Sequence, residues 1–253
     1  MSACGKYAEN MRKIFLIGTA LAVVLFFIAS RGVFAALAVI DKEGNVVVNV
    51  LSEEDSFDTS GSTLKVVGGT PEVKYTNANI ALTKDKDKLS MSVLSSSGGK
   101  DFDITNYKDS VLEIEERPAV EKISIAIANG SFVISQGNIN AQTDYQIQVD
   151  PKRGKLALET PTGYKFLSVL PKQAASLLLR SKLASNILPE NTVYILEDDK
   201  GNLYYDLTAE KVIPIFNVYN YQFNVRAKVS ATTGEIISVD EPAWYRLFNF
   251  LFV

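Results

Sequence analysis

The sequence predicts a mainly β protein with an α+β unit near its C-terminal end, preceded by an apolar N-terminal segment. Three observations lead to this prediction. Residues 39–170 contain many short runs in which apolar and polar side chains alternate, separated by turn-forming clusters. The segment after Pro171 has apolar residues at helical spacing, and alternating runs follow it. The residues from Ile14 to Ser30 carry no charge.

The apolar run follows two basic residues and precedes small residues, which is typical of a secretory signal peptide. Two pairs of small residues fit the −3 and −1 positions of a cleavage site, namely Val33 with Ala35 and Ala36 with Ala38. An uncleaved anchor is the alternative, because a helix over this run would rise about 25 Å, close to the roughly 30 Å of a hydrocarbon core. We therefore delimit residues 1–38 as a signal peptide or a signal anchor with a transmembrane helix.

Both alternatives give the same topology, because Arg12 and Lys13 hold the N-terminus in the cytoplasm. We expect an extracytoplasmic protein of the cell envelope, either secreted or tethered by a single pass. Beyond residue 35 the chain has 22 basic and 28 acidic residues, a net charge of −6. Phosphate contacts need a basic surface, so we expect no nucleic-acid partner.

Cysteine and histidine usage restricts the chemistry further. The single cysteine, Cys4, precedes the apolar run, so the exported part cannot form an internal disulfide bond. Cys4 is either a palmitoylation site or an idle thiol. The chain has no histidine, which excludes Ser-His-Asp catalysis and histidine zinc sites. We expect no catalytic residues, no metal site and no cofactor.

The β-rich region is delimited as residues 39–170. Its first predicted strands are Val46–Leu51, Leu64–Val67, Glu72–Thr76, Asn79–Thr83 and Leu89–Leu94. We expect turns between them, one of them at residues 95–101, and further alternating strands up to Leu170. Many short strands without a fixed-length repeat predict a sandwich, a barrel or a rolled sheet.

The α+β unit is delimited as residues 171–242. We expect a helix from Pro171 to Leu188, because proline suits the first helical turn and Pro189 cannot continue the helix. Three or four strands follow. In one of them, alternate residues place an apolar set on one side, namely Tyr221, Phe223, Val225, Ala227 and Val229.

The last predicted hairpin resembles that of the PepSY domain, a small exported α+β module. The match consists of Ala231, Thr233, Gly234 and Glu235, followed by an apolar strand, while Ser230 stands where the family usually has aspartate. Gly234 suits a tight hairpin, which needs a positive φ at one position. The resemblance implies a binding, inhibitory or regulatory module without catalytic residues. No such resemblance is found for residues 39–170.

Clusters of acidic residues are candidates for calcium, which binds carboxylate oxygens. They are Glu53–Asp58, Asp85 with Asp87, Glu197–Asp199, and Asp240 with Glu241. None has the spacing of an EF-hand loop, so solvated turns are the favoured interpretation. Asn129-Gly130-Ser131 is either a glycosylation sequon or a hairpin turn, and the turn is favoured.

Aromatic residues supply the candidate interaction sites. Four residues are candidates for lining a peptide or glycan groove, with an ordinary sheet core as the alternative: Tyr205, Tyr219, Tyr221 and Phe223. Residues 243–253 form an apolar tail that either contacts a membrane or a partner, or docks on the protein's own core. Its candidate contact residues are Trp244, Tyr245, Leu247, Phe248, Leu251 and Phe252.

Together these features predict an exported, non-catalytic binding or regulatory envelope protein. It would bind the membrane through its N-terminal segment and contact a protein, a peptide or an envelope polymer. The first alternative is a structural component that self-associates through strand edges and the apolar tail. The second alternative is a carboxylate-dependent hydrolase, which would need a buried pair of acidic residues in a cleft.

Overall fold

The computed structural model describes residues 36–49, 72–96, 98–118, 120–188, 193–215 and 219–248. The apolar run Ile14–Ser30, the predicted strand Leu64–Val67 and the acidic cluster Glu53–Asp58 lie outside these residues. Within the described residues, no helix is both long and apolar enough to cross a membrane. All of these described residues belong to one compact unit, residues 35–253.

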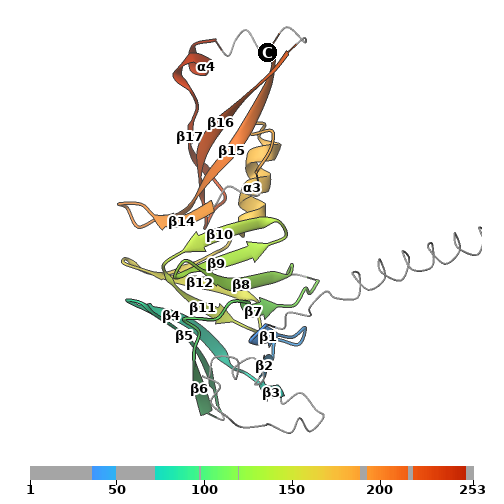
Figure 1. Cartoon of the computed structure of the whole chain (residues 1–253), viewed down its shortest axis with the longest axis vertical. Coiled ribbons are helices and arrows are strands. Elements are labelled where there is room, and N and C mark those ends of the chain that lie inside the picture. Colours follow the sequence, from blue (N-terminus) through green and yellow to red (C-terminus); the bar gives the residue numbers. More distant parts are fainter. Residues whose placement is uncertain are drawn as a thin grey trace, which may run out of the picture. The chain divides into compact units, whose positions relative to one another are not determined.

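The strands of the described residues form two sheets, and the larger has 11 strands in the order β17-β16-β15-β14-β10-β9-β8-β7-β1-β2-β3 (Figure 1). Neighbouring strands are antiparallel except for β1 with β7 and β10 with β14, which are parallel. The strands are β1 (Ala38–Ile40), β2 (Val46–Asn49), β3 (Glu72–Tyr75), β7 (Ser110–Ile114), β8 (Ile123–Ala128), β9 (Ser131–Gln136), β10 (Ile139–Thr143), β14 (Val193–Glu197), β15 (Leu203–Ile215), β16 (Tyr219–Ser230) and β17 (Ile236–Asp240).

The smaller sheet has six antiparallel strands in the order β13-β12-β11-β4-β5-β6. They are β4 (Asn79–Asp85), β5 (Lys88–Ser95), β6 (Gly98–Asp103), β11 (Gln146–Asp150), β12 (Lys155–Thr160) and β13 (Gly163–Phe166). The predicted alternation of apolar and polar residues determines which face of this sheet is buried. In β11, for example, Ile147 and Val149 are buried, whereas Gln148 between them is exposed.

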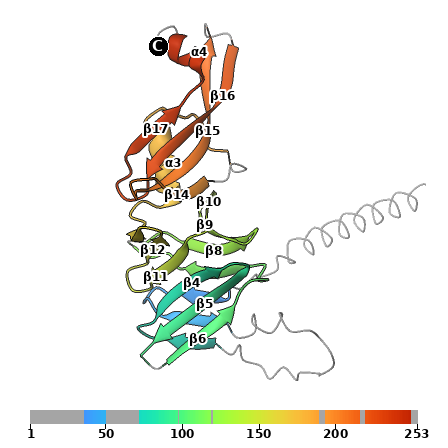
Figure 2. The ribbon, with the colours of Figure 1, turned by 90° about the vertical axis from the view of Figure 1, so that its left-hand side faces the viewer.

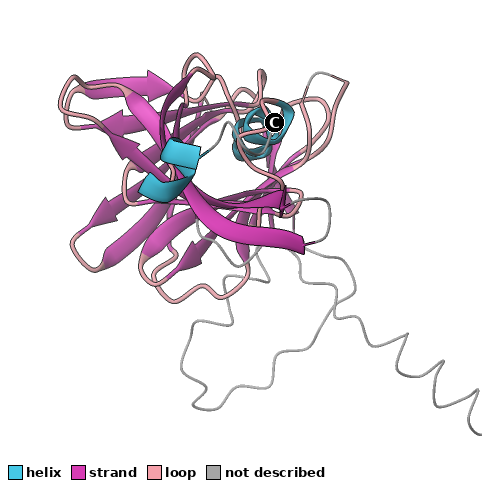
Figure 3. Cartoon of the chain, turned by 90° about the horizontal axis from the view of Figure 1, so that it is seen from above, coloured by secondary structure: helices cyan, strands magenta, loops and turns pink. Residues whose placement is uncertain are grey.

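The two sheets share one hydrophobic core, because the buried side chains of both belong to a single cluster. Strands make up most of the described chain, and the helices among the described residues are α3 (Pro171–Arg180) and α4 (Ala243–Phe248) (Figure 3). The prediction of a mainly β protein with antiparallel sheets and a helix is therefore confirmed.

One predicted turn is shorter than expected, because most of its residues belong to strands. We expected a turn at residues 95–101, but Gly98 and Gly99 begin β6 and pair with Ser95 and Leu94 of β5. A Cβ atom at Gly99 would lie 2.7 Å from the Leu94 side chain, so glycine is the residue that allows this close pairing. Glycine weakens a strand, and β6 lies at the edge of its sheet, where that cost is tolerated.

The first strand overlaps the segment delimited as 1–38. Ala36, Leu37 and Ala38 are buried, and Ala38 pairs with Val48 on one side and Leu112 on the other. The Leu37 backbone N–H also donates to the Ser110 carbonyl over 3.1 Å. These three residues therefore belong to the folded unit. The nature of the segment before them stays a prediction.

Helix α3 is shorter than predicted, because it ends at Arg180 rather than at Leu188. Lys182 has a φ of 57°, which a helix cannot accommodate. The chain then pairs with the edge of β15, where the N–H groups of Ser185 and Asn186 donate to the Glu210 carbonyl. Pairing of the backbone with β15 thus replaces the last predicted helical turns.

The sheet continues across the predicted boundary at Leu170. Helix α3 begins at that position, yet β14 beyond the helix pairs with β10 before it. Among the described residues four strands follow α3, where the alternating pattern predicted three or four. Helix α3 contacts β9, β10, β15 and β16, so it packs on strands from both segments (Figure 2). The division into residues 39–170 and 171–242 stays a prediction.

Candidate binding site beside strand β13

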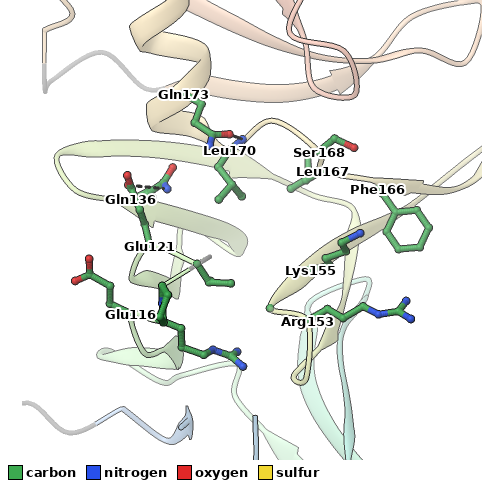
Figure 4. Close-up of a pocket in the computed structure, with 14 residues that line it drawn as sticks. Glu116, Glu121, Gln136, Arg153, Lys155, Phe166, Leu167, Ser168, Leu170 and Gln173 are labelled. Atoms are coloured by element: carbon green, nitrogen blue, oxygen red, sulfur yellow. Dashed lines mark hydrogen bonds between the residues drawn. The ribbon is translucent and has the colours of Figure 1, made fainter. Parts of the chain in front are cut away.

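A pocket of about 490 Å³ lies between strands of both sheets and the N-terminal end of α3 (Figure 4). This volume is in the usual range of ligand sites. Its charged lining residues are Arg117, Arg153, Lys155, Glu116 and Glu121. Figure 4 shows Arg153 and Lys155 on one side of the pocket and the two glutamates on the other. The pocket therefore suits a charged ligand more than an apolar one.

A tight loop holds Arg117 in the pocket wall. Arg117 and Val120 exchange backbone hydrogen bonds of 2.7 and 3.0 Å. The Arg117 guanidinium donates through Nη2 to the Pro151 carbonyl over 2.8 Å and through Nη1 to the Lys152 carbonyl over 3.2 Å. Gly154 has a φ of 61°, and a Cβ atom there would lie 3.0 Å from Val120. Glycine at this turn thus lets the loop approach β12 closely.

Gln136 fixes the opposite wall and caps α3. Its side chain is 1% exposed, and its Oε1 atom accepts a hydrogen bond of 3.2 Å from the Lys172 backbone N–H. Its Nε2 group donates to Glu121 over 3.1 Å, and Lys172 Nζ lies 3.1 Å from the same carboxylate oxygen. Since Leu170 at the start of α3 offers no polar side chain, Gln136 takes the capping role.

Gln136 was not among the candidate residues predicted from the sequence. The sequence marks this position by a break in the apolar pattern of β9. Phe132 and Ile134 are buried on one face of the strand, and Gln136 is the next residue on the same face. A polar residue on the buried face of a strand needs hydrogen-bond partners. Those partners come from α3 and from Glu121, far away in the sequence, so the pattern alone could mark the position but not its role.

Strand β13 borders the pocket and has a free edge. Among the described residues it pairs with β12 alone, and it is the last strand of its sheet. The Leu167 N–H donates to the Leu156 carbonyl over 2.9 Å, which places Leu167 in a hydrogen-bonded pair. Because such pairs alternate along antiparallel strands, the N–H and C=O groups of Tyr164 and Phe166 point away from β12. Their side chains are 54% and 60% exposed.

The other end of β13 is fastened to β14. Glu197 accepts hydrogen bonds from the hydroxyl groups of Thr162 and Thr160, the latter over 2.7 Å. The hydrogen bond from Thr162 lowers the pKa of the Glu197 carboxyl, which keeps it an acceptor. The turn before β13 is therefore held in place, and the free edge ends at the pocket beside Phe166.

Basic charge near the pocket is only partly neutralised. Arg153 lies 3.9 Å from Asp150 in an exposed pair, and such pairs contribute little. Lys155 forms no ion pair with any residue in the described ranges. Glu121, by contrast, is already paired with Lys172. The side of the pocket next to Phe166 therefore offers two cations to a ligand.

The predicted tail residues divide into two groups. Trp244 and Tyr245 of α4 pack on Phe223 of β16, with ring centres 5.4 and 5.0 Å apart, and so dock on the protein's own sheet. Leu247 is 69% exposed. The side chain of Phe248, and the residues Leu251 and Phe252, lie outside the described part.

The candidate groove aromatics also divide. Tyr205 is fully buried, its hydroxyl donates to the Val169 carbonyl over 2.7 Å, and burial raises its pKa strongly. Phe223 is buried beneath α4, so neither of these two residues lines a surface groove. Tyr219 is 64% exposed and Tyr221 is partly exposed. Two of the four candidates are therefore buried in the sheet, and two are exposed.

An ion pair adds to the docking of α4. Lys211 Nζ lies 2.8 Å from Glu241 and 4.5 Å from the centre of the Tyr245 ring, and both charged side chains are largely buried. Burial by itself would lower the pKa of Lys211, but the hydrogen bonds with Glu241 and Tyr245 raise it above its ordinary value. Lys211 is therefore held as a cation beneath the helix.

Among the described residues, no group of three or more acidic, cysteine or histidine side chains is close enough to hold a metal ion. Comparison with known proteins adds no assignment. No family model matches the chain, no curated protein matches it, and no solved structure matches its fold.

Proposed function

We propose that the chain is an exported, non-catalytic binding or regulatory protein that holds a protein or peptide partner outside the cytoplasm. The observation that carries this proposal is a free sheet edge that ends at a charged pocket, with Tyr164 and Phe166 exposed along it. A free edge offers backbone donors and acceptors to an added strand, and a neighbouring pocket can select its side chains.

The proposed location outside the cytoplasm rests on the N-terminal residues. The basic start and the apolar run Ile14–Ser30 support export, with the chain either tethered at the membrane or released by cleavage. A PepSY-like identity of residues 171–242 is consistent with a binding or regulatory role. In its support, Gly234 has a φ of 78° in the hairpin turn on which the resemblance rests.

Mapping the N-terminus of the mature protein tests the proposed location. We expect either a retained N-terminal segment that needs detergent for extraction, or a start at Ala36 in the soluble fraction. A start at Val39 is not expected, because it would remove Ala36, Leu37 and Ala38, which are buried around β1. A full-length chain in the cytoplasmic fraction would contradict export.

Site-specific crosslinking tests the binding role. The photoreactive residue p-benzoylphenylalanine replaces Phe166 in cells that naturally produce the chain, and Tyr194 is replaced in a control. Tyr194 lies on β14 and is also exposed, so crosslinks at this position measure non-specific contacts. We expect adducts with another protein at position 166 and not at position 194. Equal yields at both positions would contradict a binding site beside β13.

Self-association is a second candidate function, favoured by the exposure of Leu247 and Tyr219 on the C-terminal hairpin and α4. Contiguous groups of exposed apolar side chains commonly mark interfaces. Sedimentation of the full chain in detergent at increasing concentration distinguishes the two functions. Oligomers that grow with concentration, together with crosslinks between copies, would favour the structural role. A concentration-independent species would favour binding of a separate partner.

A further inference from the structure

We propose that β13 takes an extended acidic peptide segment as an additional strand, with a carboxylate of that segment bound by Arg153 and Lys155. This inference rests on the proposed binding function and names the class of partner. Three features of the structure carry it: the direction of the free backbone groups, the exposed side chains on the same strand, and the charges at its end.

The backbone groups set the mode of binding. Tyr164 and Phe166 each direct one N–H and one C=O group away from β12, so an added strand gains four main-chain hydrogen bonds. The four residues of β13 span about 13 Å at the usual rise of a strand. Such an edge matches a short extended segment, and main-chain hydrogen bonds supply its affinity whatever its side chains are.

The side chains favour apolar or β-branched residues in the added strand. Tyr164 and Phe166 point to the same face of the sheet, since side chains two residues apart share a face. The Tyr164 hydroxyl accepts a hydrogen bond of 3.0 Å from Gln148, which holds its ring on this face. A neighbouring strand places its side chains about 5 Å away, within contact of both rings.

The charges determine which end of the segment is acidic. Phe166 is the residue of β13 that reaches the pocket, and Arg153 and Lys155 lie on its side of that pocket (Figure 4). The opposite end is closed by the contact of Thr162 with Glu197. A carboxylate on the added strand therefore meets two cations beside Phe166, whereas a basic residue there would be repelled.

This basic site is local. The chain beyond residue 35 carries a net charge of −6, so long-range attraction does not favour acidic partners in general. Selection of an acidic segment must come from short-range contacts at Arg153 and Lys155. Binding should accordingly weaken as salt is raised, because both side chains are exposed to solvent.

Selection from displayed random decapeptides tests the class of ligand. The full chain in detergent micelles is the target, so that the N-terminal segment is retained. We expect the selected peptides to combine β-forming residues with aspartate or glutamate at one end. Enrichment of basic or uncharged peptides, or no enrichment over bare micelles, would overturn the proposal.

Charge-reversal variants test the role of the two cations. For a selected acidic peptide, the double variant R153E/K155E should bind about tenfold more weakly in fluorescence anisotropy. The matched control is the double variant K86E/K182E, which changes the net charge by the same amount at two exposed turn residues that do not line the pocket and should bind as the natural chain does. Equal loss in the control would mean that net charge, rather than this site, governs binding.

A proline variant tests the backbone contacts. Phe166→Pro removes an N–H group that points away from β12, so no hydrogen bond of the sheet is lost. Phe166→Thr is the matched control, because it also removes the ring but keeps the N–H group. We expect binding to be lost with proline and only weakened with threonine, while both variants keep the natural circular dichroism spectrum. Equal binding by the two variants would contradict strand addition.

The crosslinking experiment separates this inference from the proposed function. Adducts at position 166 whose partner segment is basic or helical would leave the binding function standing and overturn the acidic strand. Adducts with an acidic extended segment would support both. Absence of specific adducts at position 166 would contradict both.

Discussion

Two groups of aromatic side chains in this protein have different surroundings. In the C-terminal hairpin, Phe223 lies beneath Trp244 and Tyr245 of α4. On β13, by contrast, Tyr164 and Phe166 have more than half of their surface exposed. The first group packs within the protein, and the second lies along a free strand edge. The comparison teaches that an aromatic-rich segment becomes available to a partner only where no other element of the chain covers it.

Loss of one ring from each group is the strongest test of this comparison. Phe223→Ala should lower the free energy of unfolding by about 3 kcal/mol, because it leaves a cavity beneath α4. Phe166→Ala should change it by less than about 0.5 kcal/mol, since that ring is largely in solvent. Denaturant unfolding of the two variants measures both values. Equal destabilisation would show that the ring on β13 also has a structural role.

Replacement of Gln136 tests whether the pocket wall beside β13 is rigid. Gln136→Met keeps the volume but removes the cap of α3 and a hydrogen bond to Glu121, at a cost of about 1.5 kcal/mol. Gln148→Met on the exposed face of β11 is the control, and we expect little change there. Thermal unfolding of both variants checks the difference. A neutral effect of Gln136→Met would mean that solvent satisfies these groups.

Replacement of Lys211 tests how firmly α4 is docked. Lys211→Met removes the ion pair with Glu241 and the contact with the Tyr245 ring, which together contribute about 1 kcal/mol. Trp244 is the single tryptophan of the chain, so its emission reports α4 directly. We expect a red shift in this variant. Lys228→Met, which removes a contact with the Tyr204 ring, should leave the emission unchanged.

The same lysine gives a pH dependence. Because the pKa of Lys211 is raised above its ordinary value of 10.5, its ion pair contributes stability below that pH and loses it as the pH rises through the folded-state pKa. The emission maximum of Trp244 should therefore shift to the red at alkaline pH. The Lys211→Met variant lacks this cation and should show no such shift. A step of the same size in both proteins would assign it to tyrosine ionisation instead.

The smallest effect is expected at Leu247, an exposed apolar residue of α4. Leu247→Ser should change the stability by less than about 0.5 kcal/mol, because this side chain has few contacts to lose. The effect of this variant on sedimentation also tests whether α4 takes part in self-association. Loss of oligomers in this variant would give the hairpin an interface of its own, whereas unchanged sedimentation would leave β13 as the principal candidate surface.

Much of the fold was predictable because it depends on neighbours in the sequence. The buried set Val225, Ala227 and Val229 follows from strict alternation, and it is observed in β16. The hairpin turn at Asn129 and Gly130 was predicted from the pair itself, and both residues have a positive φ, 54° and 73°. In such elements the side chain and the backbone conformation are linked directly.

The candidate site was less predictable, because its parts are distant in the sequence. The contacts predicted from the sequence were at the tail and at the groove aromatics Tyr205, Tyr219, Tyr221 and Phe223, not at β13 or the pocket. Phe166 and Arg153 are ordinary strand and turn residues in the sequence, and only the hairpin between β12 and β13 brings them to one side of a pocket. The capping role of Gln136 likewise depends on α3, which is distant in the sequence.

The sequence by itself determined the apolar faces of strands such as β11 and β16 and the turns at Gly130 and Gly234, because these depend on local periodicity and on backbone sterics. Tertiary structure alone decided which faces and edges are covered. It paired β14 with β10 across the predicted boundary, ended α3 at Arg180 in favour of pairing with β15, and placed α4 over Phe223 while leaving β13 open. The physical reason is that a pattern specifies which side of an element is apolar, whereas the partner that covers this side is chosen by competition among all segments of the chain.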